Sequence, residues 1–278
     1  MAFNIQQIQF LQRLVADKPG RRRAGDAARY LSEHHYLGTI VGREVFYRAE
    51  HWSLAQQLLS TSDLPVAALG KGDQRPTRAD VAAFGGLSEK ALSARPHDDS
   101  VAIQCLGGCS LDGQEMRSPP GAYLVVRQEQ GLRIGCDRIL LVENFETFRR
   151  LNEYSWLDLQ ALRVLVVYRG DQRLPISQAA ALINKRREPI WAMVDFDPAG
   201  LVIANALPTQ RLEQVMLPQL DWLRANAVTH HGKYLYSQQT PQASQVLGKT
   251  THRQISMLWE LLQKLQSGIT QEAMRWAR

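Results

Sequence analysis

The segment Trp191-Ala-Met-Val-Asp-Phe-Asp-Pro-Ala-Gly200 joins an apolar run to two aspartates at its C-terminal end. A second segment, Leu140-Leu-Val-Glu-Asn144, has the same character and delivers Glu143. Both apolar runs predict buried β-strands. In an open α/β sheet, ligands and chemistry sit at the carboxyl ends of parallel strands. We therefore expect Glu143, Asp195 and Asp197 to converge at one edge of a sheet.

Such a cluster of carboxylates is tolerable mainly when a divalent cation neutralises it. Carboxylates and waters are the ligands that suit Mg²⁺ or Mn²⁺, so the pattern predicts a metal-dependent phosphoryl-transfer site. The competing interpretation is structural: Asp favours the position that begins a helix, and Pro198 suits the first helical turn. Asp197 fits that role as well as it fits a metal.

The pattern around these carboxylates alternates between strands and helices. Alternating elements with short loops favour a parallel sheet with crossover helices. A long amphipathic helix is predicted near the end of the chain, over residues 250–265. The expected strands cover residues 139–142, 164–168 and 190–194, and the expected helices cover 146–156, 177–187 and a short stretch after Pro198.

The N-terminal part has a different pattern, in which helices surround a short hairpin that turns at Gly42. These are the ingredients of a winged-helix unit, so we expect a mostly helical, winged-helix-like module over residues 1–117 and an α/β domain over residues 118–278. The expected helices cover 5–16, 25–34, 53–59, 77–84 and 87–94, the hairpin covers 36–47, and two further strands cover 101–106 and 122–126.

The composition is that of a globular protein, with 278 residues of which 45% are hydrophobic and 22% charged. No apolar run reaches the roughly 20 residues that a membrane helix needs. Three cysteines without a CxxC pair favour a reduced, cytoplasmic setting. The net charge is +6, with basic flanks around a neutral centre. That distribution suits a polyanion such as DNA, but charge alone favours the alternative of an ordinary solvated surface.

The order of Glu143 after one strand and Asp195-x-Asp197 after another resembles the Toprim fold. This fold is shared by type IIA and type VI topoisomerases, primases and several nucleases. The resemblance implies that these three residues bind Mg²⁺ or Mn²⁺ and serve phosphodiester chemistry. It also implies a Rossmann-like parallel sheet for the C-terminal domain.

Three local segments narrow the resemblance to the nuclease subunit of Wadjet systems, which are SMC-like, condensin-related complexes that defend bacteria against plasmids. The segments are Val142-Glu-Asn-Phe-Glu-Thr-Phe148, Val166-Val-Tyr-Arg-Gly170 and Val194-Asp-Phe-Asp-Pro-Ala-Gly200. Gln271-Glu272 resembles a Gln-Glu pair that closes those nucleases. The resemblance implies an endonuclease that cuts duplex or plasmid DNA hydrolytically and works with an SMC-like and kleisin motor. We also expect a homodimer, because cutting both strands needs two active sites and symmetric dimers are the commonest oligomers. Arg169, at the tip of the middle strand, is a candidate phosphate contact, and an ordinary surface arginine is an equal interpretation.

Two alternative functions remain open. The segment Gly42-Arg-Glu-Val-Phe-Tyr47 faintly resembles the one that carries the nucleophilic tyrosine of topoisomerase VI A subunits, which would make Tyr47 form a covalent bond to DNA. Packing in the hairpin is the favoured role for this residue. The other alternative is a non-catalytic DNA-binding adaptor on a degenerate Toprim scaffold. In each case the basic run Arg21-Arg22-Arg23 is a candidate contact to the DNA backbone.

Overall fold

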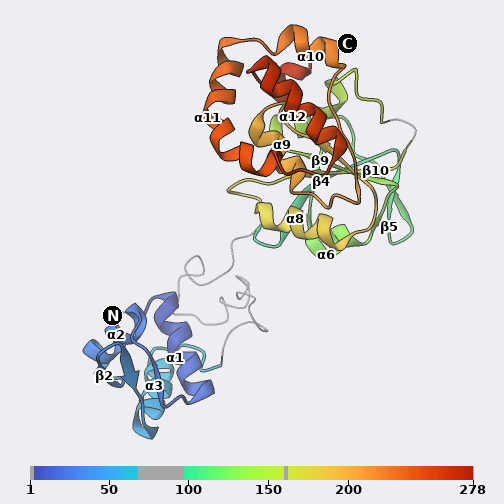
Figure 1. Cartoon of the computed structure of the whole chain (residues 1–278). Coiled ribbons are helices and arrows are strands. Elements are labelled where there is room, and N and C mark those ends of the chain that lie inside the picture. The colour runs from blue at the N-terminus through green and yellow to red at the C-terminus, as the bar shows by residue number, and fades with distance from the viewer. Residues whose placement is uncertain (1–2, 68–96, 160–161, 278) are drawn as a thin grey trace. The chain divides into compact units, whose positions relative to one another are not determined.

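The computed structural model describes residues 3–67, 97–159 and 162–277, and it divides the chain into two compact units (Figure 1). The first unit runs from Met1 to Pro96 and the second from His97 to Arg278. The expected helices over 77–84 and 87–94 lie outside the described residues. None of the helices in the described ranges is long and apolar enough to cross a membrane.

The first unit packs helices around a small antiparallel sheet whose strand order is β1-β3-β2. Its elements match the predicted ones closely, and Gly42 takes the expected left-handed conformation with φ +61 at the hairpin turn. The three strands and three helices bury one apolar core. The elements are α1 (Ile5–Asp17), β1 (Arg21–Arg23), α2 (Asp26–His35), β2 (Thr39–Val41), β3 (Glu44–Phe46) and α3 (Ala49–Thr61).

The second unit is built on a six-stranded sheet of order β12-β11-β9-β10-β4-β7. The four strands from β12 to β10 are parallel, whereas β4 and β7 are antiparallel to their neighbours. The sheet is therefore mixed, and the prediction of a parallel sheet holds only for these four. The strands are β4 (Ser100–Leu106), β7 (Leu124–Arg127), β9 (Arg138–Val142), β10 (Val164–Tyr168), β11 (Ile190–Met193) and β12 (Leu212–Val215).

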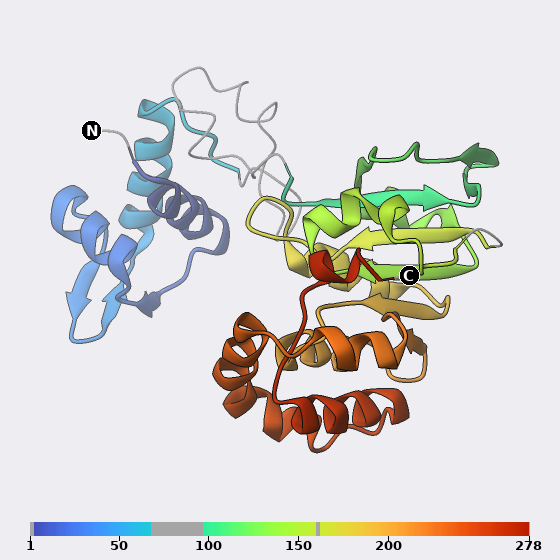
Figure 2. The same cartoon turned by 90° about the horizontal axis from the view of Figure 1, so that it is seen from above.

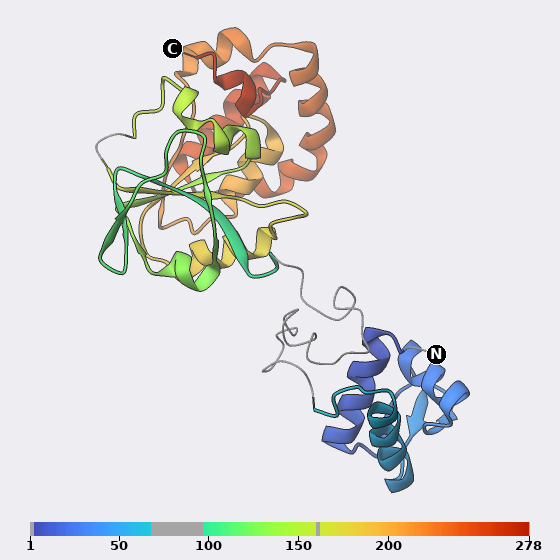
Figure 3. The same ribbon diagram turned by 180° about the vertical axis from the view of Figure 1, so that it is seen from behind.

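Helices lie on both sides of this sheet. In Figure 1, α6 and α8 pack against each other below the sheet, and α9, α11 and α12 form a group above it. A further small sheet of order β6-β5-β8 lies at the end away from α11 (Figure 3). The remaining elements are β5 (Cys109–Leu111), β6 (Gln114–Met116), α6 (Gln128–Leu132), β8 (Ile134–Gly135), α8 (Ile176–Lys185), α9 (Pro198–Asn205), α10 (Leu220–Asn226), α11 (His230–Leu247) and α12 (Arg253–Leu265).

Two sequence predictions differ from the structure. The expected division at residue 117 falls after Pro96 instead, because β4 pairs with both β10 and β7 and so belongs to the large sheet. The helix expected over 146–156 is the short α7 (Phe145–Arg149), followed by a 3₁₀ turn over Leu151–Glu153.

Candidate active site

The carboxylates of the acidic motifs lie where two neighbouring strands end. Strand β9 lies between β10 and β11 and is parallel to both, with Val142 opposite Met193 and Tyr168. The backbone pairing continues one step further, since the amide of Glu143 donates to the carbonyl of Met193 at 3.1 Å. The prediction that the two acidic segments are adjacent parallel strands is therefore confirmed.

Glu143 and Asp195 form a close acidic pair. The backbone amide of Asp195 donates to Oε2 of Glu143 at 3.2 Å. Burial raises the pKa of Glu143 above its usual value, and the nearby charge of Asp197 adds to this. Burial also raises the pKa of Asp195 to about 8, with the charge of Glu143 as the next cause. The environment of these two carboxyl groups therefore disfavours having both of them negatively charged.

Asp197 has a different environment, because both of its carboxylate oxygens have partners. Its Oδ1 accepts from the amide of Gly200 at 2.7 Å, which caps the N-terminus of α9. Its Oδ2 accepts from Nε2 of Gln239 on α11 at 2.9 Å. The side chain is buried, and Pro198 occupies the first turn as the capping interpretation predicts. Asp197 lies beside the acidic pair, but its oxygens hold α9 and α11 together.

The C-terminal pair Gln271-Glu272 lies against the same edge of the sheet. After α12 the chain returns to the strands (Figure 2) and pairs Ile269 with Phe196 before it forms α13 (Gln271–Met274). The amide of Gln271 donates to Oδ1 of Asp195 at 2.7 Å. Nε2 of Gln271 is buried and has no hydrogen-bond partner among the described residues.

Asn144 connects this pair to the end of β9. Its amide donates to Oε1 of Gln271 at 2.9 Å, and its Nδ2 donates to Oε1 of Glu272 at 2.6 Å. Its own Oδ1 caps α7 by accepting from two amides. Sequence reasoning did not single out Asn144, although an asparagine just before a helical segment is a recognised capping signal.

A pocket of about 530 Å³ opens at this edge of the sheet. It is lined by Glu143, Asn144, Phe145, Glu146, Tyr168, Arg169, Gly170 and Asp195. Arg169 is the pocket's positive charge, and it lies close enough to lower the pKa of Glu143 in part. The structure thus brings Arg169 beside the acidic pair.

The oxygen ligands at this edge suit a cation that keeps several of its waters, rather than one that is coordinated by protein groups alone. Among the described residues, no three His, Cys, Asp or Glu side chains form a group that could hold a metal. Mg²⁺ usually keeps several waters and uses one or two carboxylates, and Glu143 with Asp195 meets that requirement. A bound cation would also relieve the repulsion that raises the pKa of both carboxyls. Glu143 and Asp195 line the pocket, whereas each carboxylate oxygen of Asp197 already accepts a hydrogen bond, one from Gly200 and one from Gln239.

Close backbone packing explains why the last residue of the acidic motif, Gly200, is a glycine. A Cβ atom at this position would lie 2.2 Å from the carbonyl oxygen of Asp195, which is too close for any side chain. Only glycine therefore lets α9 begin directly behind the loop that carries Asp195. The motif combines a site residue, a cap and a close backbone approach within six positions.

The basic run of the first unit divides into two kinds of arginine. Arg21 and Arg23 are exposed on β1. Arg22 instead forms an ion pair with Asp17, and its Nε is buried. Tyr47 is also buried in this unit, at 4% exposure, and burial raises the pKa of its hydroxyl to about 12. The structure thus favours the packing role of Tyr47.

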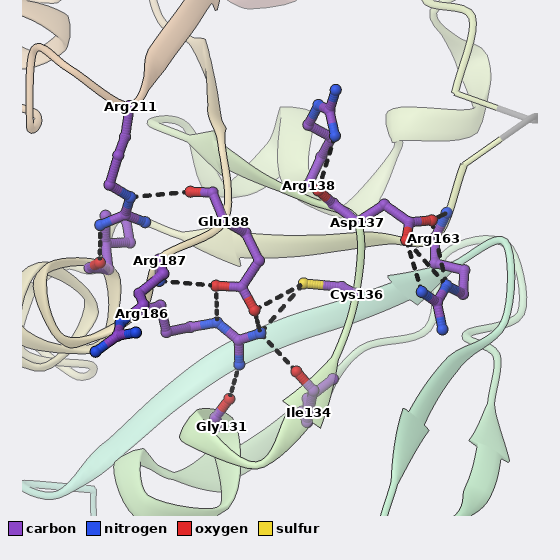
Figure 4. A network of polar contacts seen from close by, with 11 residues as sticks. Gly131, Ile134, Cys136, Asp137, Arg138, Arg163, Arg186, Arg187, Glu188 and Arg211 are labelled. Atoms are coloured by element: carbon purple, nitrogen blue, oxygen red, sulfur yellow. Dashed lines mark hydrogen bonds and ion pairs between the residues drawn. The ribbon is translucent and has the colours of Figure 1, made fainter.

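A second basic run, Lys185-Arg186-Arg187, lies at the C-terminal end of α8. Arg186 is buried and donates to the carbonyls of Gly131 and Ile134, each at 2.6 Å, and it forms an ion pair with Glu188 (Figure 4). These contacts hold the C-terminal end of α8 against α6 and β8, so Arg186 has a structural role.

Comparison with known proteins places the second unit in a family. No curated protein matches the chain. The family described as "Domain of unknown function (DUF7281)" matches residues 98–276, which covers most of the second unit and all of its candidate site residues. The chain therefore belongs to the DUF7281 family.

Proposed function

We propose that this chain is a metal-dependent DNA endonuclease of the Toprim type, acting in the cytoplasm as the effector of a Wadjet-like SMC defence complex. The observation that carries the proposal is the Glu143–Asp195 pair, held at the ends of two adjacent parallel strands. Two half-buried carboxylates with raised pKa values are the arrangement expected of a functional site. The mixed α/β architecture around a four-stranded parallel core is compatible with a Toprim domain.

Four residues at this edge of the sheet have distinct parts in the proposed hydrolysis. Glu143 and Asp195 would hold Mg²⁺ or Mn²⁺, which polarises the scissile phosphate and lowers the pKa of a bound water. The amide of Gln271 fixes the orientation of Asp195. Arg169 supplies a guanidinium that suits a phosphate oxygen. Glu143 has the alternative role of general base through a water.

The first unit is proposed as a winged-helix-like module that contacts DNA. Arg21 lies opposite Phe46 in the β1–β3 pair, so both side chains share one face of the small sheet. Arg23 is exposed on that same face, two residues further along β1. Exposed arginines on a short sheet suit contact with the phosphate backbone. Cleavage of both strands would need two active sites, which a symmetric homodimer provides.

The second candidate is a DNA-binding adaptor that uses the same scaffold without cleavage. Its support is that Asp197, the second aspartate of the motif, caps α9 and accepts a hydrogen bond from Gln239 on α11. An adaptor would bind DNA and leave it intact with either metal.

The test is to incubate supercoiled plasmid with the full chain and Mn²⁺ or Mg²⁺. We expect nicking by the unaltered protein, and a loss of at least about 100-fold in Glu143→Gln and Asp195→Asn, the scale typical of losing a catalytic group. Asp221→Asn is the matched control, because that carboxylate is 91% exposed on α10. Nicking by Asp195→Asn at the unaltered rate would remove the proposed site, and no cleavage by any variant would favour the adaptor.

A further inference from the structure

Four aromatic rings connect the pocket to the surface of the second unit. Phe145 lies 5.0 Å from Tyr168 and 5.5 Å from Tyr123, measured between ring centroids. Phe148 contacts all three and is fully buried. We call these four residues the aromatic cluster. Two of its members, Phe145 and Tyr168, line the same pocket as Glu143 and Asp195.

The outer end of the aromatic cluster is exposed. Tyr123 is 37% exposed, and Leu124 and Val125, which follow it on β7, are each 43% exposed. Strand β7 is the last strand of the sheet, so this apolar surface continues to an edge. Exposed apolar side chains beside a polar pocket are a feature of ligand-binding sites.

The charges around the pocket determine what suits this surface. Glu143, Asp195 and Glu146 make one part of the lining acidic, whereas the part formed by Phe145 and Tyr168 is uncharged. A phosphate group would require a cation or Arg169 to approach the acidic part. The part formed by Phe145 and Tyr168 suits an uncharged group.

We propose that Tyr123 and Phe145, the two members of the aromatic cluster that are not buried, form a stacking platform for an unpaired nucleobase next to the phosphate that is cut. This inference rests on the proposed nuclease function and specifies its substrate. Stacking on an aromatic side chain needs a base with a free face. Inside a duplex both faces of a base are covered by its neighbours, so the base must leave the stack first. The substrate strand is therefore single-stranded or locally opened where it enters the pocket. Negatively supercoiled plasmid DNA meets this condition more readily than relaxed DNA.

The test measures stacking separately from cleavage. The full chain carrying Asp195→Asn is titrated into an oligonucleotide with one 2-aminopurine, first as a single strand and then as a duplex. We expect fluorescence quenching and tighter binding with the single strand. Tyr123→Ala in that background should weaken binding by roughly 5- to 150-fold, the range measured for single base–aromatic stacks.

Two matched variants separate stacking from folding. Tyr123→Phe keeps the ring and should retain both quenching and affinity. Tyr234→Ala removes a more exposed tyrosine from α11, at 58% exposure, and should leave both unchanged. Equal quenching and affinity in Tyr123→Ala and its parent would overturn the stacking platform, as would preferred binding of the duplex. Metal-dependent nicking by the unaltered protein would still stand in either case, so the two proposals fail separately.

Discussion

Burial and the charge of Glu143 disfavour the ionised carboxyl group of Asp195, and they outweigh the hydrogen bond that it accepts from the amide of Gln271. Its pKa of about 8 in the folded chain lies above the usual 3.8. Between these values the folded state binds a proton that the unfolded state has lost, so this group makes stability fall as pH rises. The full contribution is present below the unfolded pKa and is lost as pH passes the folded pKa.

Asp195→Asn should therefore change how stability depends on pH. Without metal, we expect the variant to match the unaltered protein near pH 4 and to be more stable at pH 8 to 9, by on the order of 1–3 kcal/mol. Thermal unfolding of the second unit across this pH range measures the difference. Adding Mg²⁺ at high pH should restore stability to the unaltered protein alone. If the stability of the two proteins changed with pH in the same way, Asp195 would not have a raised pKa.

Tyr47 gives a second test at a single side chain. Its hydroxyl is buried and has no hydrogen-bond partner among the described residues. Tyr47→Phe removes that group, so stability should stay equal or rise by up to about 1 kcal/mol. Plasmid nicking should be unchanged. A loss of nicking in the folded variant, together with loss of a covalent protein–DNA adduct, would instead support a tyrosine nucleophile.

The two aspartates of the motif differ because of the elements that they serve. Asp197 holds the start of α9 and the side chain of Gln239, whereas Asp195 accepts one amide from Gln271 and faces the pocket. Asp197→Ala should lower the free energy of unfolding by about 1–2 kcal/mol, as typical for a lost cap. Above pH 7, Asp195→Ala should not lower the free energy of unfolding, because it removes a carboxyl group whose charge is disfavoured. Equal losses in the two variants, measured by denaturant unfolding, would show that the roles are not divided in this way.

Part of this arrangement was predictable and part was not. Adjacent parallel strands bring their carboxyl ends together, so the meeting of Glu143 and Asp195 followed from two apolar runs. The partner of Asp197 lies 42 residues later, on a helix that the pattern did not reveal. Helix α11 contains Pro241 and many polar residues, and its apolar positions lack a clear period. Strand β12 spans only four residues, Leu212–Val215, with two exposed side chains between its buried ends.

The N-terminal module could be predicted more completely than the site. Its helices and hairpin depend on local signals, such as the capping pair of Asn4 and Gln7 and the turn at Gly42. The position of α13 depends instead on contacts far along the chain, because Asn144 and Gln271 are 127 residues apart. The predicted domain boundary near residue 117 was wrong for the same reason, because the strands that pair with β4 lie elsewhere in the sequence and local patterns do not identify them.

Across the whole molecule, DNA binding should depend on exposed arginines of the first unit. The double variant Arg21→Ala/Arg23→Ala should weaken binding to duplex DNA and reduce the slope of log affinity against log salt by about 1–2. Arg224→Ala/Lys249→Ala removes two exposed basic side chains from the second unit and serves as the matched control. An unchanged salt slope in the first variant would exclude Arg21 and Arg23 as phosphate contacts.

The central claim is that Glu143 and Asp195 form a metal site, and calorimetric titration of the full chain with Mn²⁺ tests it most directly. At pH 7 we expect one site per chain and the release of about one proton, because the pKa of Asp195 is about 8 and a ligating carboxyl must be ionised. Running the titration in two buffers with different ionisation enthalpies counts that proton. Glu143→Gln and Asp195→Asn should abolish binding, and Asp197→Asn should retain it. Mn²⁺ affinity that is equal in all four proteins would contradict the account.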